Sequence, residues 1–191
     1  AEVASRADVD RIIDSPRRDP IGDDWVFNES VGPLQDSLDS TIQPSLTAIS
    51  APQVWTDFDV RGAGIIVASA DTGVDWTHPS IRERYAGDPN SHDYTWFDAW
   101  RGSETPNDWN GHGTHTTGTM VGVDGIGVAP EAEWIGCMNM GQTFYNAPGY
   151  LACMQFLFAP FPVGGDPLKD GDPKRGAHVV NNSWGCPIDE G

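Results

Sequence analysis

Three short apolar runs occur along the chain, and segments of helical composition lie between them. Residues 65–70, with the sequence IIVASA, are apolar or small throughout, which is typical of a strand that is buried on both faces of a sheet. Residues 133–139 and 177–185 contain the second and third strand candidates. Because strands that alternate with helices favour parallel pairing, the pattern predicts an α/β fold, a doubly wound parallel sheet with helices on both faces.

Three segments beside these runs are predicted to be helical. Residues 50–58 carry Ser50 at the N-cap position and Pro52 in the first turn, both common at the start of a helix. A second helix is predicted to begin at His112 and to end near residue 121. The third covers residues 148–159, where we expect an apolar stripe to face the core. The members of this stripe are Leu151, Met154, Phe156, Leu157 and Phe158.

Residues 82–109 are predicted to form a long irregular connection that is rich in Asp, Asn, Trp and Tyr. We expect its aromatic side chains to form a small apolar cluster of their own, because a long loop needs such contacts to hold it in place. These side chains are Trp96, Phe97, Trp100 and Trp109. A stacking platform for a ligand is the alternative interpretation.

Residues 1–42 differ from the rest of the chain because they are polar and acidic, and Pro16 and Pro20 interrupt any helix there. We interpret them as an N-terminal extension or linker. Residues 43–191 then belong to one domain, since a chain of 191 residues is long enough for a single sizeable core.

The charge of the chain excludes two classes of partner. It has 28 acidic residues against 11 basic ones, a net charge of −17, so it is not expected to bind nucleic acid or anionic membranes, which require the opposite sign. No apolar run approaches the roughly 20 residues that span a bilayer. The residues after Ala1 do not resemble a signal peptide, since they lack a basic start followed by an apolar block. The acidity suits an exported protein, although a solvated surface explains it equally well.

The chain has three cysteines, Cys137, Cys153 and Cys186. They are too few for a disulfide scaffold, and their spacing does not match a zinc site. Cys137 and Cys153 flank a predicted strand-to-helix connection, so they are candidates for one disulfide. Cys186 is left either free or with a partner outside this chain.

Asp71 follows the first apolar run directly. It therefore stands at the C-terminal end of a buried strand, where sites form in open α/β sheets. One alternative is an acid that caps the next turn. Another is the Asp-Thr-Gly of an aspartic protease, which needs a second copy of the motif or a dimer of an all-β fold. The sequence has no second copy, and its pattern is α/β.

Residues 110–120, NGHGTHTTGTM, contain two histidines, three glycines and four threonines without an acid. This composition predicts a thin helix that neighbours can approach closely, with His112 presented at its start. His112 and His115 also form an H-x-x-H pair, a spacing at which two histidines can bind a metal ion. The glutamate of the zinc motif is absent and no third ligand suggests itself, so catalysis is the favoured role for His112.

Asp71 and His112 are expected to converge at one edge of the sheet. The carboxylate can then hold one imidazole nitrogen, fix the tautomer and stabilise the imidazolium. Such a pair is useful only with a nucleophile that the second nitrogen deprotonates.

Three motifs in order carry a resemblance to a known family. ADTGVDWTHP at residues 70–79, NGHGTHTTGTM at residues 110–120 and VNNSWG at residues 180–185 resemble the subtilisin-like serine proteases, or subtilases. Within this family the sequence most resembles the bacillopeptidase F-like branch, because HGTHTTGTMVG, GVAP and VVNNSWG all occur. The resemblance extends from about residue 44 to residue 185.

The resemblance implies a subtilisin-like fold and peptide-bond hydrolysis by an Asp-His-Ser triad. Asp71 matches the triad aspartate and His112 the triad base. Ser183, Trp184 and Gly185 resemble the segment that lines the specificity pocket and pairs with a peptide or protein substrate. Gly141, at the start of residues 141–143, resembles the facing segment, so the peptide is expected to lie between the two as an added strand.

The family's nucleophilic serine and oxyanion-hole asparagine lie in later motifs that this sequence lacks. We therefore expect the chain to be the N-terminal part of a catalytic domain, with residues 1–42 an extension or pro-segment remnant. Its partner would be a complementary C-terminal half or chain. Removal of the serine costs on the order of a million-fold in turnover, so the chain alone is expected to be inactive.

No cofactor is expected; calcium binding is the alternative, but its site is not identifiable from the sequence. Many relatives hold calcium with an acid nine residues after the triad aspartate and with a loop inside the histidine helix. Here that position is Ser80, and residues 120–128 leave no room for the loop.

The favoured hypothesis is a secreted serine endopeptidase. The alternative is a non-catalytic structural or binding subunit, derived from half of a subtilase, that uses an open sheet edge to hold a partner strand.

Overall fold

The computed structural model describes residues 19–20, 42–141 and 147–185. Its centre is a sheet of four parallel strands in the spatial order β3, β4, β2, β5. Their bounds are Trp96–Asp98 for β3, Glu133–Met138 for β4, Ile66–Asp71 for β2 and Val179–Asn181 for β5. The predicted parallel α/β sheet is therefore confirmed.

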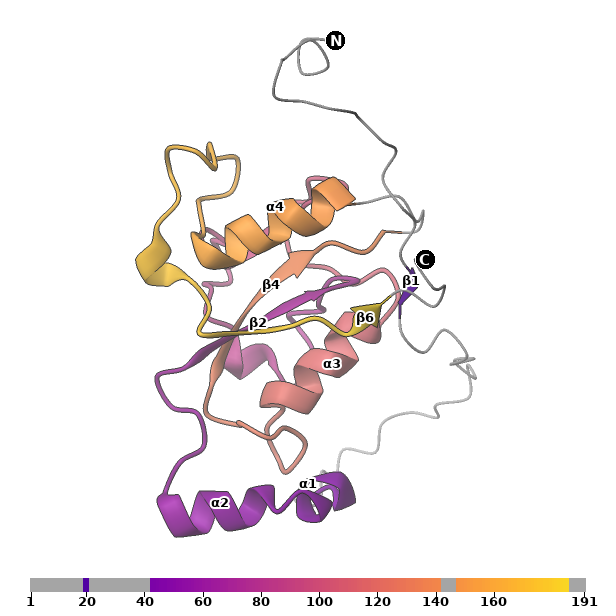
Figure 1. Cartoon of the computed structure of the whole chain (residues 1–191), viewed down its shortest axis with the longest axis vertical. Coiled ribbons are helices and arrows are strands. Elements are labelled where there is room, and N and C mark those ends of the chain that lie inside the picture. Colours follow the sequence, from indigo (N-terminus) through magenta and orange to yellow (C-terminus); the bar gives the residue numbers. More distant parts are fainter. Residues whose placement is uncertain (1–18, 21–41, 142–146, 186–191) are drawn as a thin grey trace, which may run out of the picture.

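Two helices cover opposite faces of this sheet (Figure 1). The helix α3, His112–Val121, packs on one face against β2, and α4, Ala147–Phe158, packs on the other face against β4. The predicted helix start at His112 is confirmed. The short helices α1, Pro44–Ala48, and α2, Ala51–Phe58, lie beyond α3 and carry a small core of their own, Leu46, Ala51 and Trp55.

Side chains alternate between the two faces along each strand, and this explains which residues form the core on each face of the sheet. On β2, Ala68 and Ala70 point toward α4, whereas Val67 points toward the face that α3 covers. On β4, Cys137 shares the α4 face and Trp134 the α3 face. Asp71 has the parity of Val67, so its side chain is delivered to the side of the sheet that carries α3.

The strand β3 corrects one expectation. Residues 82–109 were predicted to be irregular with an aromatic cluster of their own, but Trp96 and Phe97 belong to a strand of the main sheet. Trp96 is only 2% exposed, and the Phe97 ring packs against Phe156 of α4 and Phe161. The aromatic side chains thus tie this segment to the sheet. The segment also contains the 3-10 turn Arg82–Arg84.

The apolar stripe predicted for α4 is also partly wrong. Phe156 and Leu157 are buried, but Leu151, Met154 and Phe158 are 62%, 45% and 75% exposed. The helix instead buries Tyr150 and Cys153 with Phe156 and Leu157. Almost every position of this helix is apolar, so its sequence does not indicate which side faces the sheet.

The remaining elements lie near the two ends of the described chain. Ser50 occupies the N-cap position of α2 as predicted, but its side chain makes no capping hydrogen bond. A 3-10 turn, Pro173–Arg175, precedes β5. The two-residue strands β1, Asp19–Pro20, and β6, Trp184–Gly185, pair antiparallel. Among the described residues, no helix has the length and apolarity that a membrane crossing requires.

Candidate active site

Asp71 and His112 lie side by side where β2 ends and α3 begins. The distance between His112 Nδ1 and Asp71 Oδ1 is 2.7 Å. The Asp71 side chain is 0% exposed and the His112 side chain 19% exposed. Asp71 also accepts hydrogen bonds from the Thr72 amide and, at 3.3 Å, from the Thr116 hydroxyl. With its oxygens serving as acceptors, the carboxylate orients the imidazole with Nδ1–H toward it and the second nitrogen away.

This contact requires the start of α3 to press against the turn after β2. Gly113 permits it, because a Cβ at this position would overlap the carbonyl oxygen of Gly73 and lie 3.1 Å from Cβ of Asp71. Gly73 in turn has φ of 109° and lies against the carbonyl oxygen of Asn107. The small residues that the sequence places around His112 are therefore needed where the two elements touch.

Asp108 was missed by sequence reasoning, although it lies at the centre of this junction. One of its oxygens accepts hydrogen bonds from Thr72 Oγ1 and from the amides of Asn110 and Gly111. The other accepts from the amide and the hydroxyl of Thr114. The available signal was an acid shortly before a helix start, where free amides and the helix dipole favour a negative charge.

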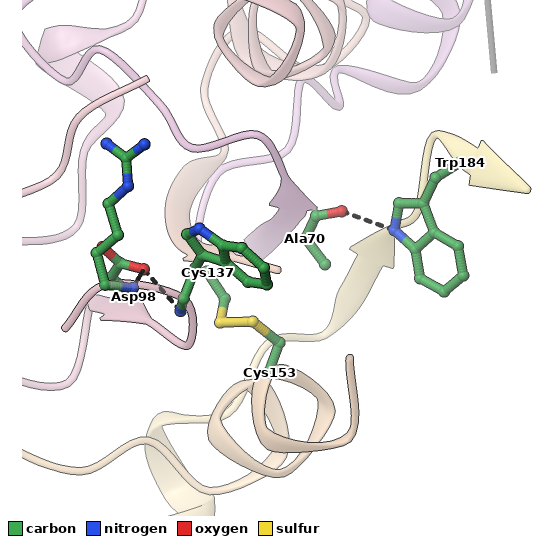
Figure 2. Close-up of a disulfide and its surroundings, with 7 residues drawn as sticks. Ala70, Asp98, Cys137, Cys153 and Trp184 are labelled. Atoms are coloured by element: carbon green, nitrogen blue, oxygen red, sulfur yellow. Dashed lines mark hydrogen bonds between the residues drawn. A yellow bond between two sulfur atoms is a disulfide. The ribbon is translucent and has the colours of Figure 1, made fainter. Parts of the chain in front are cut away.

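The residues predicted to bind substrate lie around the ends of β2 and α4. Trp184 donates from its indole nitrogen to the carbonyl oxygen of Ala70 at 2.9 Å, directly before Asp71 (Figure 2). Its ring packs against Tyr150 of α4, with 4.4 Å between the centroids. The Ser183 hydroxyl accepts from the Asn181 amide at 2.9 Å. Gly185 pairs with β1.

Gly141 lies on the other side of this region and is buried. A Cβ there would overlap the ring of Trp100, so only glycine fits this position. Residues 142–143, which complete the predicted facing segment, lie outside the described residues.

A disulfide between Cys137 and Cys153 joins β4 to α4, as Figure 2 shows. Both side chains are completely buried. Because Cys137 is the register partner of Ala70, the bond lies beside the strand end that carries Asp71. Sequence reasoning had marked this pair as candidates, and the structure contains the bond. Cys186 lies outside the described residues.

Three groups that lie away from this junction have shifted pKa values. Burial raises the pKa of Tyr85 to about 12, partly offset by its hydrogen bond with Thr95. Burial lowers the pKa of His92, against the opposing charges of Asp88 and Asp93. Tyr85 and His92 contact each other at 3.0 Å and help to hold the connection before β3. On the surface, the Lys169 side chain lowers the pKa of Asp166.

The position expected from the resemblance to carry a calcium-binding acid holds Ser80 instead. Ser80, at the position where relatives carry an acid, is buried, and its carbonyl oxygen accepts the amide of Val123. The chain turns directly after α3, where the Gly127 amide donates to Gly122, so the ligand-bearing loop has no counterpart. Within the described ranges, no group of three His, Cys, Asp or Glu side chains is arranged to hold a metal ion.

Comparison with known proteins identifies the family of this chain. Residues 62–190 match the model of the Subtilase family. Bacillopeptidase F of Bacillus subtilis (strain 168) is 33% identical over 195 residues, which cover 96% of this chain and 13% of that protein. The intracellular serine protease of Paenibacillus polymyxa is 38% identical over 103 residues, 52% of this chain and 30% of that protein.

The fold has a counterpart among solved structures. Fervidolysin from Fervidobacterium pennivorans, a keratinolytic enzyme related to subtilisin, superposes with a TM-score of 0.51 and 23% identity, over 77% of this chain and 22% of its own. The chain thus spans less than a third of the length of each of these relatives. The family match covers most of the chain and includes both Asp71 and His112, so the chain belongs to the Subtilase family.

Proposed function

We propose that this chain supplies the base and its orienting carboxylate to a serine endopeptidase. His112 is the general base and Asp71 the residue that holds it, and the nucleophilic serine lies in a part of the protein beyond this chain. The observation that carries the proposal is the 2.7 Å contact between His112 Nδ1 and the fully buried Asp71. Membership of the Subtilase family supports the same reaction.

The chemistry follows from the orientation of the imidazole. The serine oxygen attacks the carbonyl carbon of the substrate as its proton passes to the second nitrogen of His112. Asp71 stabilises the imidazolium that forms. The peptide bond then breaks as His112 returns the proton to the leaving amine, and water, activated in the same way, releases the acyl group from the serine.

The substrate is proposed to lie as an extended strand along β6, between Ser183–Gly185 and the segment that begins at Gly141. The antiparallel pairing of β1 with β6 supports this assignment, because an extended segment of the chain already pairs with the backbone of Trp184 and Gly185 in the way proposed for the substrate. The Trp184 side chain, held by Tyr150 and by the Ala70 carbonyl, forms one wall of the proposed binding site.

The Cys137–Cys153 disulfide supports an extracytoplasmic location, because such bonds persist in oxidising compartments and are rare in the cytosol. The net charge of −17 agrees with export. A similar protein from Paenibacillus polymyxa is named as intracellular, so the redox state of these cysteines in cells is the decisive observation. Recovery of an oxidised pair from the culture medium supports secretion, and a reduced pair in the cell fraction contradicts it.

The strand β5 supports a continuation of the sheet beyond this chain. Within the part of the chain that the structure describes it pairs with β2 alone, and Val179 is 58% exposed. We propose that the part of the protein that carries the serine packs against this edge, which otherwise leaves backbone groups without partners.

A fluorophosphonate probe tests the proposed function on the intact protein. The probe reacts only with an activated serine, so we expect it to label a serine outside residues 1–191, and we expect His112→Ala to abolish the labelling. His115→Ala, on the next turn of the same helix, serves as the matched control and should retain it. Absence of labelling in the intact, folded protein contradicts the endopeptidase and favours a structural or binding subunit.

A further inference from the structure

We propose that Asp108 is a positioning residue that clamps the start of α3 to the end of β2 and so sets the distance between His112 and Asp71. The proposal deepens the proposed function, because it concerns the same catalytic pair. Asp108 does not contact substrate or the reacting atoms in this account. It acts through the hydroxyl groups of Thr72 and Thr114.

Asp108 collects hydrogen bonds from both elements that meet at the junction. Asp108 accepts five hydrogen bonds, from the amides of Asn110, Gly111 and Thr114 and from the hydroxyls of Thr72 and Thr114. All are between 2.6 and 3.1 Å long. Every partner is a donor, so the carboxylate serves only as an acceptor in its ionised form. Charge-assisted bonds of this kind are about twice as strong as neutral ones.

The hydroxyls of Thr72 and Thr114 each bond both to Asp108 and to the opposite element. Thr72, on the turn after β2, accepts the amide of Gly113 from α3. Thr114, on α3, accepts the amide of Asp75 from the turn after β2. Each hydroxyl oxygen therefore accepts a hydrogen bond from an amide of the opposite element. Its single proton remains available and is donated to Asp108. One carboxylate thus completes both cross-links between the elements.

One of these cross-links lies directly beside the catalytic pair. Thr72 directly follows Asp71, and Gly113 directly follows His112, so the Gly113–Thr72 bond of 2.9 Å joins the neighbours of the two catalytic residues. If Asp108 is lost, both hydroxyls lose their acceptor. A shift of about 1 Å between catalytic groups is enough to cost about a hundred-fold in rate.

A simpler interpretation is that Asp108 only caps α3, since it accepts amides near the helix start. The Thr72 bond distinguishes the two interpretations. Capping uses donors from residues 110–114 alone, whereas the clamp also needs the hydroxyl on the β2 side. Thr72→Val removes this hydroxyl, and with it the acceptor for the Gly113 amide, but leaves the four bonds from residues 110–114 to Asp108 in place.

The test compares Asp108→Ala, Asp108→Asn and Thr72→Val in the intact protein, with Asp88→Ala as the matched control. Asp88 lies in the same connection, but its hydrogen bonds stay within residues 88–91. We expect Asp108→Ala to lower kcat for a peptide substrate about a hundred-fold with KM near the wild-type value. Asp108→Asn should be intermediate, because the amide nitrogen replaces one acceptor oxygen. The Asp88→Ala variant should match the wild type.

A second measurement does not depend on protease activity. The rate at which diethyl pyrocarbonate modifies His112 is followed by mass spectrometry, with the exposed His115 as an internal reference in the same helix. We expect faster modification of His112, relative to His115, in Asp108→Ala and Thr72→Val, because the imidazole is no longer held against Asp71. A wild-type protein without protease activity would overturn the proposed function while leaving this readout intact.

Two results would overturn the clamp. One is an unchanged His112 modification rate in the Asp108 and Thr72 variants. The other is a wild-type kcat for Thr72→Val, which would reduce Asp108 to a helix cap. If Asp108→Ala does not fold, Asp108→Asn and Thr72→Val carry the same test, because each removes only part of the network.

Discussion

The disulfide between Cys137 and Cys153 is predicted to stabilise the part of the fold on which the active site stands. The perturbation is the double substitution Cys137→Ala, Cys153→Ala, which removes the bond between β4 and α4. Two consequences are expected. The unfolded chain gains freedom, and α4 loses its covalent attachment to the strand beside Ala70. Since Tyr150 of α4 supports Trp184, KM for peptides should also rise.

The magnitude follows from the length of chain that the bond closes. The two cysteines are 16 residues apart, and closure of a loop of this length lowers the entropy of the unfolded state enough to stabilise the fold by roughly 3 kcal/mol. At 1.4 kcal/mol per factor of ten, this corresponds to about a hundred-fold change in the unfolding equilibrium. Amides of β4 and α4 that exchange only on unfolding should therefore exchange about a hundred-fold faster.

Hydrogen exchange with mass spectrometry on the intact protein measures this change, with peptides that cover residues 133–138 and 147–158. Cys186→Ala is the control, because it removes a cysteine but leaves the bond in place. A reductant should speed exchange in the wild type and have no effect on the double variant. Equal exchange rates in wild type and double variant would refute the stabilising role.

Two substitutions and one deletion test the site further. Gly113→Ala should abolish fluorophosphonate labelling, because its Cβ would overlap the Gly73 carbonyl and push α3 from β2; normal labelling would contradict the close approach. Trp184→Phe should cost about 1 kcal/mol of stability in a chemical denaturation curve and raise KM, because the donor to Ala70 is lost, and an unchanged KM would remove Trp184 from the binding site. Deletion of residues 1–41 should lower KM by freeing β6 from β1, and a higher KM would mean that this segment assists binding.

The sequence was sufficient for features that depend on neighbours along the chain. The buried run before Asp71 and the small residues after His112 predicted a strand end and a helix start, because local composition determines both. The proximity of Cys137 and Cys153 followed from their places on either side of one connection. In each case the two partners belong to successive elements of the fold.

The features that were missed depend on contacts across the fold. β3 has only three residues, too few for a periodic pattern, and it forms because β4 offers a free edge. The buried side of α4 is determined by the sheet and the disulfide, since the helix is apolar almost all round. Asp108 obtains its role from Thr72, which is 36 residues away, and no spacing rule connects an acid before a helix with a hydroxyl after a strand.

Asp71 is proposed to act through His112, so that the two form one catalytic unit, and the kcat of the Asp71→Ala, His112→Ala double variant tests this proposal. We expect Asp71→Ala and His112→Ala each to lower kcat by at least about ten-thousand-fold. Because an orienting carboxylate has no role without its base, the double variant should be no slower than His112→Ala alone. A double variant in which the two losses multiply would contradict the account, since Asp71 and His112 would then contribute independently.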